Sequence, residues 1–326
     1  MEYDIEQLAF TQINRAYNSV YRPGRLSLGV VAPLESYAVG AQPSMERHIE
    51  RIQMLESLGF AAVWLRDVPF NVPSFGDTGQ MYDPFVYLGF LAAHTQSIAL
   101  GVASIILPLR HPAHIAKAAA SVDVLSGGRL LLGVASGDRP EEYPALNMSF
   151  NDRGARFRES FHYIRQMWEH APEFENNYGS PYGGMDMLPK PYFGKLPLLI
   201  TGSSQQSPDW IAQNGEGWIT YPRDISVQSR LINDWRNRIE EYDGNDKPVS
   251  QSLYIDLVED SGAPPQPIHL GFRLGVHQLR SYLKTLENIG VNHVALNLRF
   301  NQQDIEKTLY RLSHDVLPEF LPACSN

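Results

Sequence analysis

The chain has 326 residues, with 27 Lys and Arg against 36 Asp and Glu, and therefore a net charge of −9. Apolar residues make up 43% of the chain, which is enough for a core and excludes wholesale disorder. The acidic balance argues against nucleic acid or an anionic membrane as the main partner. The length fits two ordinary domains or one α/β barrel.

The sequence predicts a soluble protein of the reducing cytoplasm. Its first ten residues, MEYDIEQLAF, have neither the basic start nor the apolar stretch of a signal peptide. The most apolar run, at 97–109, is shorter than the ~20 residues that span a bilayer. The single cysteine, Cys324, cannot form an intramolecular disulfide or a cysteine metal cluster, and we interpret it as a spectator thiol.

Short apolar runs alternate with longer amphipathic stretches after a mixed, polar N-terminal extension over residues 1–25. Runs of this kind are typical of parallel strands that are covered on both faces. The predicted strands are 26–33, 61–65, 98–107, 129–135, 197–201, 217–221, 249–256 and 292–298. The predicted helices are 44–58, with Ser44 as candidate N-cap, 83–95, 112–125, 152–170, 205–214, 225–242, 275–289 and 303–316.

Eight strands that alternate with eight helices predict an α/β fold, a (β/α)8 TIM barrel with insertions, as a single domain over 1–326. An open doubly wound sheet is the alternative. Two irregular insertions interrupt the pattern, at 171–196 and 257–273. The second follows the seventh strand, on the face where barrels carry their active sites, and is therefore the better candidate for a lid.

The tripeptide LGV recurs at 28–30, 100–102 and 132–134, each time inside a predicted strand. Glycine in a strand often marks the close approach of another backbone or of a ligand. Three small residues would equally fit crowded layers of barrel side chains, and the sequence leaves both interpretations open.

Several common motifs are absent. No GxGxxG follows the first strand and no GxxxxGK[ST] occurs, so a Rossmann unit and a P-loop have no support. His111 and His114 lack a further ligand nearby, and we interpret them as a solvated helix start rather than a metal site. Ser136 in GVASGD does not match the nucleophile elbow GxSxG. Glu141 and Glu142 follow a strand end and are interpreted as an exposed acidic turn rather than an acid/base pair.

Small and hydroxyl residues follow the fifth strand at Gly202, Ser203, Ser204 and Gln205, before a predicted helix. Backbone amides and hydroxyl groups at such a position form a ready phosphate site. The alternative is ordinary N-capping of the helix by Ser203 or Ser204.

The stretch IALGVASIILPLRHP, followed by AKAAASVDVLSGGRLLLGVASGD, resembles the core signature of the luciferase-like flavin-dependent monooxygenases. The resemblance runs over most of residues 26–316 and is strongest from 98 to 138. It implies a barrel that binds FMN or, in sister branches, the deazaflavin coenzyme at the top of the barrel.

The resemblance also implies positions for the cofactor. A non-prolyl cis peptide, on which the flavin ring rests, would fall at Ala103–Ser104. Ser136 would contact the flavin phosphate, where the luciferase itself has arginine. The phosphate loop corresponds to the segment 202–205, and Tyr221 corresponds to a position that faces the ring.

One departure from the family pattern concerns catalysis. The luciferases have a catalytic histidine just after the second strand, whereas this chain has Val68 and Pro69 there. Asp67 is the nearest titratable group and is our candidate for orienting or deprotonating a reactant. A salt bridge from Asp67 to Arg66 or Arg110 is the alternative.

The resemblance implies a flavoprotein oxidoreductase, a monooxygenase that uses reduced FMN and molecular oxygen on a small organic substrate. Reduced flavin would come from a separate flavin reductase, and a homodimer is expected. Alternatives are a deazaflavin-dependent dehydrogenase on the same fold and a non-catalytic flavin-binding barrel. Tyr37, Phe70, Phe75 and Tyr82 suggest an aromatic-lined entrance.

Overall fold

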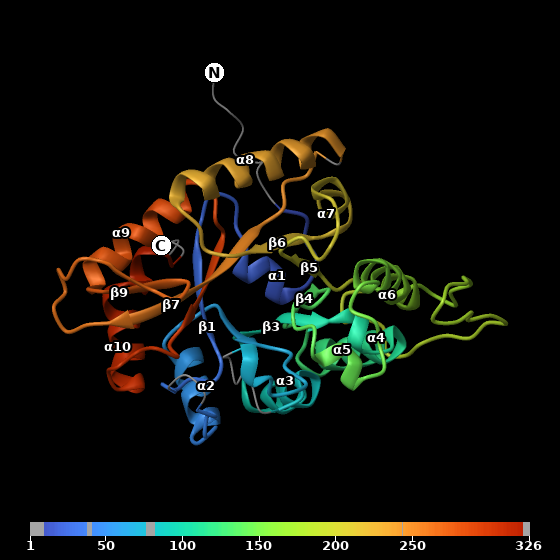
Figure 1. Cartoon of the computed structure of the whole chain (residues 1–326), viewed down its shortest axis with the longest axis horizontal. Coiled ribbons are helices and arrows are strands. Elements are labelled where there is room, and N and C mark those ends of the chain that lie inside the picture. The colour runs from blue at the N-terminus through green and yellow to red at the C-terminus, as the bar shows by residue number, and fades with distance from the viewer. Residues whose placement is uncertain (1–9, 38–40, 76–81, 243, 322–326) are drawn as a thin grey trace.

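The computed structural model describes residues 10–37, 41–75, 82–242 and 244–321, and shows a closed barrel of parallel strands (Figure 1). Each barrel strand pairs with the next in chain order, and β7 pairs with β10 to close the ring, with Ser250 opposite His293. The predicted (β/α)8 TIM barrel is confirmed, and the open sheet is wrong. The barrel strands are β1 (Ser27–Val31), β2 (Ala62–Leu65), β3 (Ala99–Ile106), β4 (Leu130–Ala135), β5 (Leu198–Thr201), β6 (Gly217–Thr220), β7 (Val249–Leu257) and β10 (His293–Asn297).

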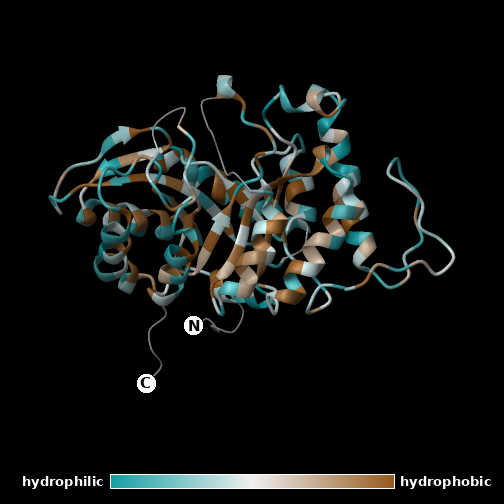
Figure 2. Cartoon of the chain, turned by 90° about the horizontal axis from the view of Figure 1, so that it is seen from below, coloured by the Kyte–Doolittle hydropathy of each residue, from teal (hydrophilic) through white to brown (hydrophobic). Residues whose placement is uncertain are grey.

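A helix follows each barrel strand and packs on the outside of the ring, with apolar residues turned inward (Figure 2). These helices lie within or close to the predicted ranges. They are α2 (His48–Ser57), α3 (Pro84–His94), α4 (Pro112–Leu125), α6 (Arg153–Trp168), α7 (Pro208–Asn214), α8 (Ile225–Tyr242), α9 (Val276–Asn288) and α10 (Ile305–Asp315). Short helical turns add α5 (Glu142–Ala145), η2 (Pro73–Phe75), η3 (Leu107–Leu109) and η4 (Leu317–Glu319). None of the described helices is both long and apolar enough to cross a membrane.

The start of the first outer helix differs from the prediction. Ser44 does not cap α2, which begins at His48 with Arg47 in the N-cap position. The Ser44 hydroxyl instead donates a hydrogen bond of 2.7 Å to the Glu35 carboxylate, so it holds the loop after β1.

The N-terminal extension contains a helix that the sequence analysis did not predict, α1 (Arg15–Val20). Its residues Tyr17 and Tyr21 are buried inside the N-terminal mouth of the barrel, and the Tyr17 hydroxyl donates to the Glu216 carbonyl oxygen at 2.7 Å. Asn14 caps α1 and also donates to the Leu130 carbonyl oxygen at 2.8 Å. The extension therefore closes the bottom of the barrel.

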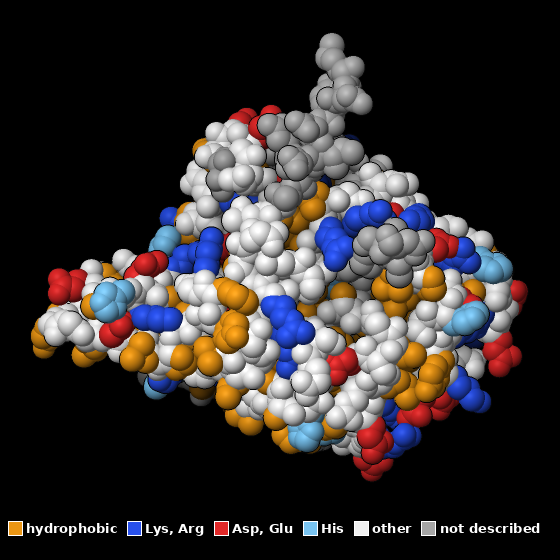
Figure 3. Space-filling view, turned by 180° about the vertical axis from the view of Figure 1, so that it is seen from behind, with side chains coloured by type: hydrophobic (Ala, Val, Ile, Leu, Met, Phe, Trp, Pro, Cys, Tyr) orange, Lys and Arg blue, Asp and Glu red, His pale blue; other side chains and the backbone are white. Residues whose placement is uncertain are grey.

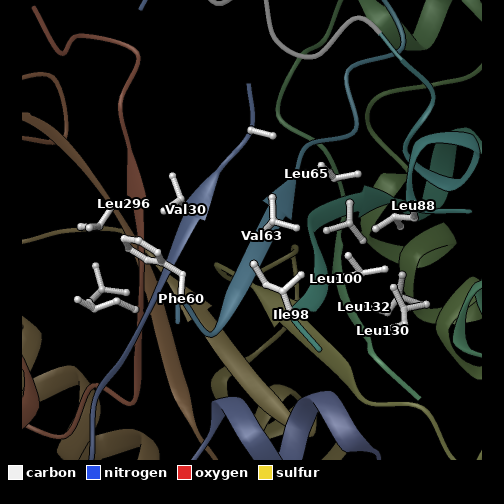
Figure 4. Packing of buried hydrophobic residues seen from close by; sticks show 14 of the residues in the cluster. Val30, Phe60, Val63, Leu65, Leu88, Ile98, Leu100, Leu130, Leu132 and Leu296 are labelled. Carbon is white, nitrogen blue, oxygen red and sulfur yellow. The ribbon is translucent and has the colours of Figure 1, made fainter. Parts of the chain in front are cut away.

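The main core lies between the ring of strands and the outer helices. Figure 4 shows side chains from β1 to β4, β10 and α3 that pack there, among them Val30, Val63 and Leu88. A second, smaller cluster fills the barrel interior and includes Trp64, Leu131 and the α1 side chains. Because alternate residues of a strand point to opposite faces, strands such as β1, β2 and β4 contribute residues to both clusters in alternation.

The insertion 171–196 forms an arm that extends from the barrel beyond α6 in both ribbon views (Figures 1 and 2). It lies along the outside of α4 and α6, where Lys190 donates to the Met167 carbonyl oxygen at 3.1 Å and the backbone N–H of Tyr192 donates to Asp123 at 2.9 Å. Tyr178 of the arm contacts the opposite ends of the same two helices, where its carbonyl oxygen lies 3.1 Å from Nε2 of His111, the N-cap of α4, and its ring packs against Arg156 in the first turn of α6. The arm therefore spans the side of the barrel from the lower ends of α4 and α6 to their upper ends.

The insertion 257–273 is not irregular throughout, and that part of the prediction is wrong. It forms a hairpin of β8 (Gln266–Ile268) and β9 (Gly271–Leu274), and β9 adds to the upper end of β7 in parallel. A β-carbon on Gly271 would collide with the Tyr254 backbone, so glycine is required for this pairing. The pairing joins residues distant in sequence, which local patterns do not reveal.

The glycines of the LGV repeats make room for crowded neighbours. A β-carbon on Gly29 would lie 2.7 Å from the Ala62 carbonyl oxygen and 2.8 Å from the His293 ring, and one on Gly101 would collide with the Trp64 indole. The Gly133 position faces the Val102 carbonyl oxygen. The crowded-layer interpretation is therefore correct for Gly101, whereas backbone approach also applies at Gly29 and Gly133. Cys324 lies outside the described residues.

Candidate functional site

A cavity of about 530 Å³ opens at the C-terminal ends of the barrel strands. All of the site residues predicted from the sequence line it: Asp67, Ala103, Ser104, Ser136, Gly202, Ser203, Ser204, Gln205 and Tyr221. They come from the ends of β2 to β6, which the ring of strands brings together. This is the face on which barrel enzymes carry their active sites.

The peptide bond between Ala103 and Ser104 is cis, as the resemblance implied. The Ser104 side chain is buried and its hydroxyl contacts that of Thr201 on β5. A β-carbon on Gly133 would collide with the Val102 carbonyl oxygen and lie 3.3 Å from the α-carbon of Ala103. Glycine on β4 therefore allows β3 to bulge toward it between Val102 and Ile105.

The loop after β5 turns sharply at the cavity wall. Gly202, Ser204 and Gln205 have φ angles of 57°, 45° and 60°, a left-handed conformation that is uncommon for residues other than glycine. The Ser204 hydroxyl donates to the Thr201 carbonyl oxygen at 2.8 Å and holds the turn. The N-cap of α7 is Ser207, so the alternative interpretation, in which Ser203 or Ser204 caps this helix, is wrong.

Arg153 places a cation beside this loop, at the first turn of α6. It lines the cavity, its guanidinium lies 3.7 Å from the Phe150 ring centre and its Nε is buried without a hydrogen-bond partner. A β-carbon on the next residue, Gly154, would lie 2.7 Å from the β-carbon of Gln205, so α6 packs directly on the loop. No ion pair joins Arg153 to a carboxylate in the part of the chain that the structure describes.

The loop after β4 forms another part of the cavity wall and contacts η2 through Arg139, whose guanidinium lies 4.5 Å from the Phe75 ring centre. Ser136 is buried, and its carbonyl oxygen accepts a hydrogen bond from the Tyr143 hydroxyl. Gly137 has a φ of 78°, and a β-carbon there would lie 2.9 Å from the Tyr143 hydroxyl. Glycine thus lets this loop fold over α5 and bring Ser136 to the cavity.

The interpretation of Glu141 and Glu142 as an exposed turn is wrong for one of the two. Glu141 is exposed and accepts from the Ser74 hydroxyl at 2.8 Å, but Glu142 is buried, lines the cavity and lies 3.4 Å from the Arg139 guanidinium. Burial raises the pKa of the Glu142 carboxyl, and Arg139 partly offsets that shift.

Asp67 is held by two partners. Arg110 donates to its carboxylate from Nη2 at 2.8 Å and from Nε at 3.3 Å, and the backbone N–H of Ile106 donates at 3.1 Å. The side chain is 1% exposed. Of the alternatives open in the sequence, the geometry matches the salt bridge to Arg110, which ties the end of β2 to the end of β3.

The rest of the rim is polar on the side of β7 and β10. Ser252, Tyr254 and Asn297 line the cavity there, together with Arg66, which donates to the Tyr37 hydroxyl at 3.2 Å. Of the aromatic residues predicted at the entrance, only Phe75 lines the cavity among the described residues, where it lies under Arg139. Tyr37 is buried, Phe70 is exposed away from the cavity, and Tyr82 packs against His48.

The described residues contain no group of three or more His, Cys, Asp and Glu side chains that could hold a metal ion. His111 accepts a hydrogen bond from the Ala113 backbone N–H at 3.2 Å and caps α4, as a helix-start residue does.

Sequence reasoning missed several lining residues: Trp64, Arg139, Glu142, Arg153, Thr201, Ser252, His293 and Asn297. Thr201, Ser252 and Asn297 lie at or near the C-terminal ends of predicted strands, a signal that the barrel rule alone could have used. Arg153 and Glu142 depend on how α6 and α5 approach the rim, which no local pattern shows.

Comparison with known proteins gives relatives with two kinds of cofactor. A flavin-dependent trigonelline monooxygenase, oxygenase component, from Acinetobacter baylyi is 25% identical over 224 residues, which are 65% of this chain and 59% of that protein. An F420-dependent hydroxymycolic acid dehydrogenase from Mycobacterium tuberculosis is 28% identical over 214 residues, 63% of this chain and 55% of that one. The chain thus spans little more than half the length of these relatives.

Solved structures with the same fold include a monooxygenase from Streptomyces bottropensis, with a TM-score of 0.75 at 18% identity over 90% of this chain and 100% of that one. The oxygenating constituent of 3,6-diketocamphane monooxygenase from Pseudomonas putida, in complex with FMN, has a TM-score of 0.70 at 15% identity. The match covers 92% of this chain and 100% of that one. The family model for luciferase-like monooxygenases matches residues 25–258. The chain therefore belongs to the luciferase-like monooxygenase family.

Proposed function

We propose that this protein is an FMN-dependent monooxygenase, which uses reduced FMN and molecular oxygen to oxidise a small organic substrate. The observation that carries the proposal is the cavity itself, in which the cis peptide at Ala103–Ser104 and the loop 202–205 line one continuous space. When bound, reduced flavin supplies the reaction with oxygen, and the chain supplies position and electrostatics.

The residues of the cavity fit the two ends of such a cofactor. The backbone N–H groups of Ser203 and Ser204 donate no hydrogen bond within the described part of the chain, and Arg153 adds a cation beside them. A phosphate would satisfy these donors. The ring would lie against Ala103 and Ser104, with Tyr221 on the adjoining wall, and Ser136 would contact the phosphate.

We assign Asp67 a positioning role in this scheme. Both of its oxygen atoms accept hydrogen bonds from Arg110 or Ile106, so it holds the end of β3 next to the cis peptide. Reactants would then face the polar wall formed by Arg66, Ser252 and Asn297. This wall favours a polar substrate over a long apolar chain.

Two partners belong to the proposal. Reduced flavin would come from a separate reductase, as the name of the trigonelline relative, an oxygenase component, suggests. A homodimer would cover apolar side chains that α3 and α4 expose, among them Val86, Phe90 and Leu125. Figure 3 shows further apolar side chains along the arm, where Tyr182 and Met185 are exposed.

A deazaflavin-dependent dehydrogenase is the second candidate, since an F420-dependent relative matches over a similar share of the chain. The test is an anaerobic titration of the purified protein with oxidised FMN, reduced FMN and the deazaflavin coenzyme. Tight binding of FMN, followed by incorporation of isotopically labelled oxygen into a substrate, supports the monooxygenase. Selective binding of the deazaflavin supports the dehydrogenase. FMN binding without turnover of any oxygen would indicate a non-catalytic flavin-binding barrel.

A further inference from the structure

A second pocket, of about 390 Å³, opens at the N-terminal end of the barrel, on the opposite side from the cofactor cavity. Its walls come from the end of α1, the start of β1, the residues before β2, and η4 with the residues after it. Apolar side chains that are buried form much of the wall, beside the hydroxyl residues Ser19 and Ser27: Val20, Leu26, Leu28, Leu317 and Phe320. The volume is within the range of pockets that hold small molecules.

Two arginines stand at this pocket, and the backbone holds them opposite each other. Arg22 and Arg25 form an antiparallel bridge across Pro23 and Gly24, with the Arg25 N–H donating to the Arg22 carbonyl oxygen at 3.2 Å. Gly24 has a φ of 65°, which this turn requires. Side chains directly opposite each other in an antiparallel pair project from the same face, and like charges in that position repel each other.

Neither arginine has an ion pair within the described part of the chain. The nearby Glu287 carboxylate is already engaged, because it accepts from the Leu26 backbone N–H at 3.0 Å and from Lys284 at 2.9 Å. In a chain with a net charge of −9, Arg22 and Arg25 are thus two exposed cations on paired backbone positions, without a carboxylate partner in the described residues. An anion between them would convert the repulsion into two charge-assisted hydrogen bonds.

We propose that this pocket binds an amphipathic carboxylate, with its apolar chain on the Leu28, Leu317 and Phe320 wall and its carboxylate between Arg22 and Arg25. The apolar wall supplies the affinity for the chain, since removal of apolar surface from water is favourable. The two guanidinium groups select a negatively charged head, to which Arg can donate bidentate hydrogen bonds. The site is separate from the cofactor cavity and does not depend on the proposed function.

The test uses the whole purified chain and three probes in calorimetric titrations, with decanoate kept below its micelle concentration. Decanoate has both parts of the ligand, decanol lacks the charge and acetate lacks the chain. We expect decanoate to bind with one-to-one stoichiometry, decanol to bind at least about tenfold more weakly and acetate to give no measurable binding.

Variants then locate the bound probe. Arg22→Gln together with Arg25→Gln should weaken decanoate at least about tenfold and leave decanol unchanged, whereas Arg230→Gln, at an exposed arginine of α8, should leave both unchanged. Arg153→Gln should not affect decanoate, and saturation with FMN should not displace it. The proposal would be overturned if decanoate did not bind, or if decanol bound as tightly as decanoate. It would also be overturned if Arg153→Gln abolished the binding of decanoate.

Discussion

The indole N–H of Trp64 donates a hydrogen bond of 2.8 Å to Nε2 of His293 and joins β2 to β10 across the floor of the cofactor cavity. The other ring nitrogen, Nδ1, lies 2.7 Å from the Ser27 hydroxyl. Because Nε2 accepts from Trp64, the neutral ring carries its proton on Nδ1 and donates it to Ser27. The Ser27 hydroxyl donates in turn to the Val20 carbonyl oxygen at 2.7 Å.

This histidine makes the stability of the protein depend on pH. Burial lowers the pKa of His293 from 6.5 to about 3. Between these values the unfolded chain binds a proton here that the folded chain does not, so the free energy of unfolding decreases as the pH falls, by up to about 1.4 kcal/mol per pH unit. His293→Gln should make the slope of that free energy against pH shallower below pH 6.5 by up to this amount, as measured in urea titrations.

The control for His293 is His170→Gln, because the His170 side chain is 94% exposed. It should leave the slope as it is in the original chain. An unchanged slope in His293→Gln would mean that the folded protein admits a proton at the floor of the cavity.

Arg153 should contribute to phosphate affinity. Arg153→Gln removes the cation beside the loop 202–205 and should weaken FMN about 10- to 100-fold, the equivalent of a charge-assisted hydrogen bond of roughly 1.5–3 kcal/mol. Riboflavin, which lacks the phosphate, should bind both proteins equally. Fluorescence titration measures both constants, and an equal loss for the two flavins would show that Arg153 acts on the ring or on the fold.

Ser204→Asp places a negative charge in the same loop and should weaken FMN by repulsion of the phosphate while riboflavin is spared. The hydroxyl it replaces donates to the Thr201 carbonyl oxygen at 2.8 Å, so circular dichroism must show that the loop change leaves the fold intact. FMN affinity equal to that of the original chain would remove the loop 202–205 from the proposed site.

Gly133→Ala should disturb the bulge of β3 at the cis peptide, because its new β-carbon would collide with the Val102 carbonyl oxygen and press on Ala103. We expect loss of flavin binding and a lower free energy of unfolding, by about 1–3 kcal/mol for an overpacked site. The matched control is Gly89→Ala on α3, where a β-carbon meets nothing within 4 Å and helix propensity should stabilise by up to about 1 kcal/mol. Similar stability and binding in the two variants would contradict the crowding argument.

Asp67→Asn separates a positioning role from proton transfer. The change removes the charge of a buried carboxylate that holds Arg110, and we expect a loss of unfolding free energy of about 1.5–3 kcal/mol. Turnover per bound flavin should stay within a few-fold, with an unchanged pH profile. A large fall in turnover at unchanged stability would instead make Asp67 an acid or base of the reaction.

Val86→Asp tests the proposed homodimer. The Val86 side chain is 73% exposed on the first turn of α3, where a carboxylate is compatible with the helix dipole and the monomer fold should persist. A buried charge at an apolar interface should dissociate the dimer, as light scattering would show, whereas Val86→Thr should keep it. Identical masses for all three proteins would place the interface elsewhere or show that none forms.

The eight strands and the outer helices could be predicted because each is encoded by a local apolar pattern. The loops that line the cavity could be predicted because they directly follow the ends of those strands. Two additions could not be predicted. The helix α1 presents only one turn of apolar spacing between polar residues, and β9 becomes a strand only by pairing with distant β7. In the site, Gly202 and Ser204 could be recognised because small and hydroxyl residues follow a predicted strand. Arg153 could not, because its place at the cavity depends on the tertiary packing of α6 on the loop, where Gly154 contacts Gln205.

The helix α1 determines how molecules can enter and leave the barrel interior. Tyr17 and Tyr21 block the N-terminal mouth, so in the described part of the chain the cavity behaves as a well with its floor at Trp64 and His293. Whatever enters over the rim leaves over the same rim. If two molecules bind in this cavity together, the one that lies deeper must bind first and dissociate last.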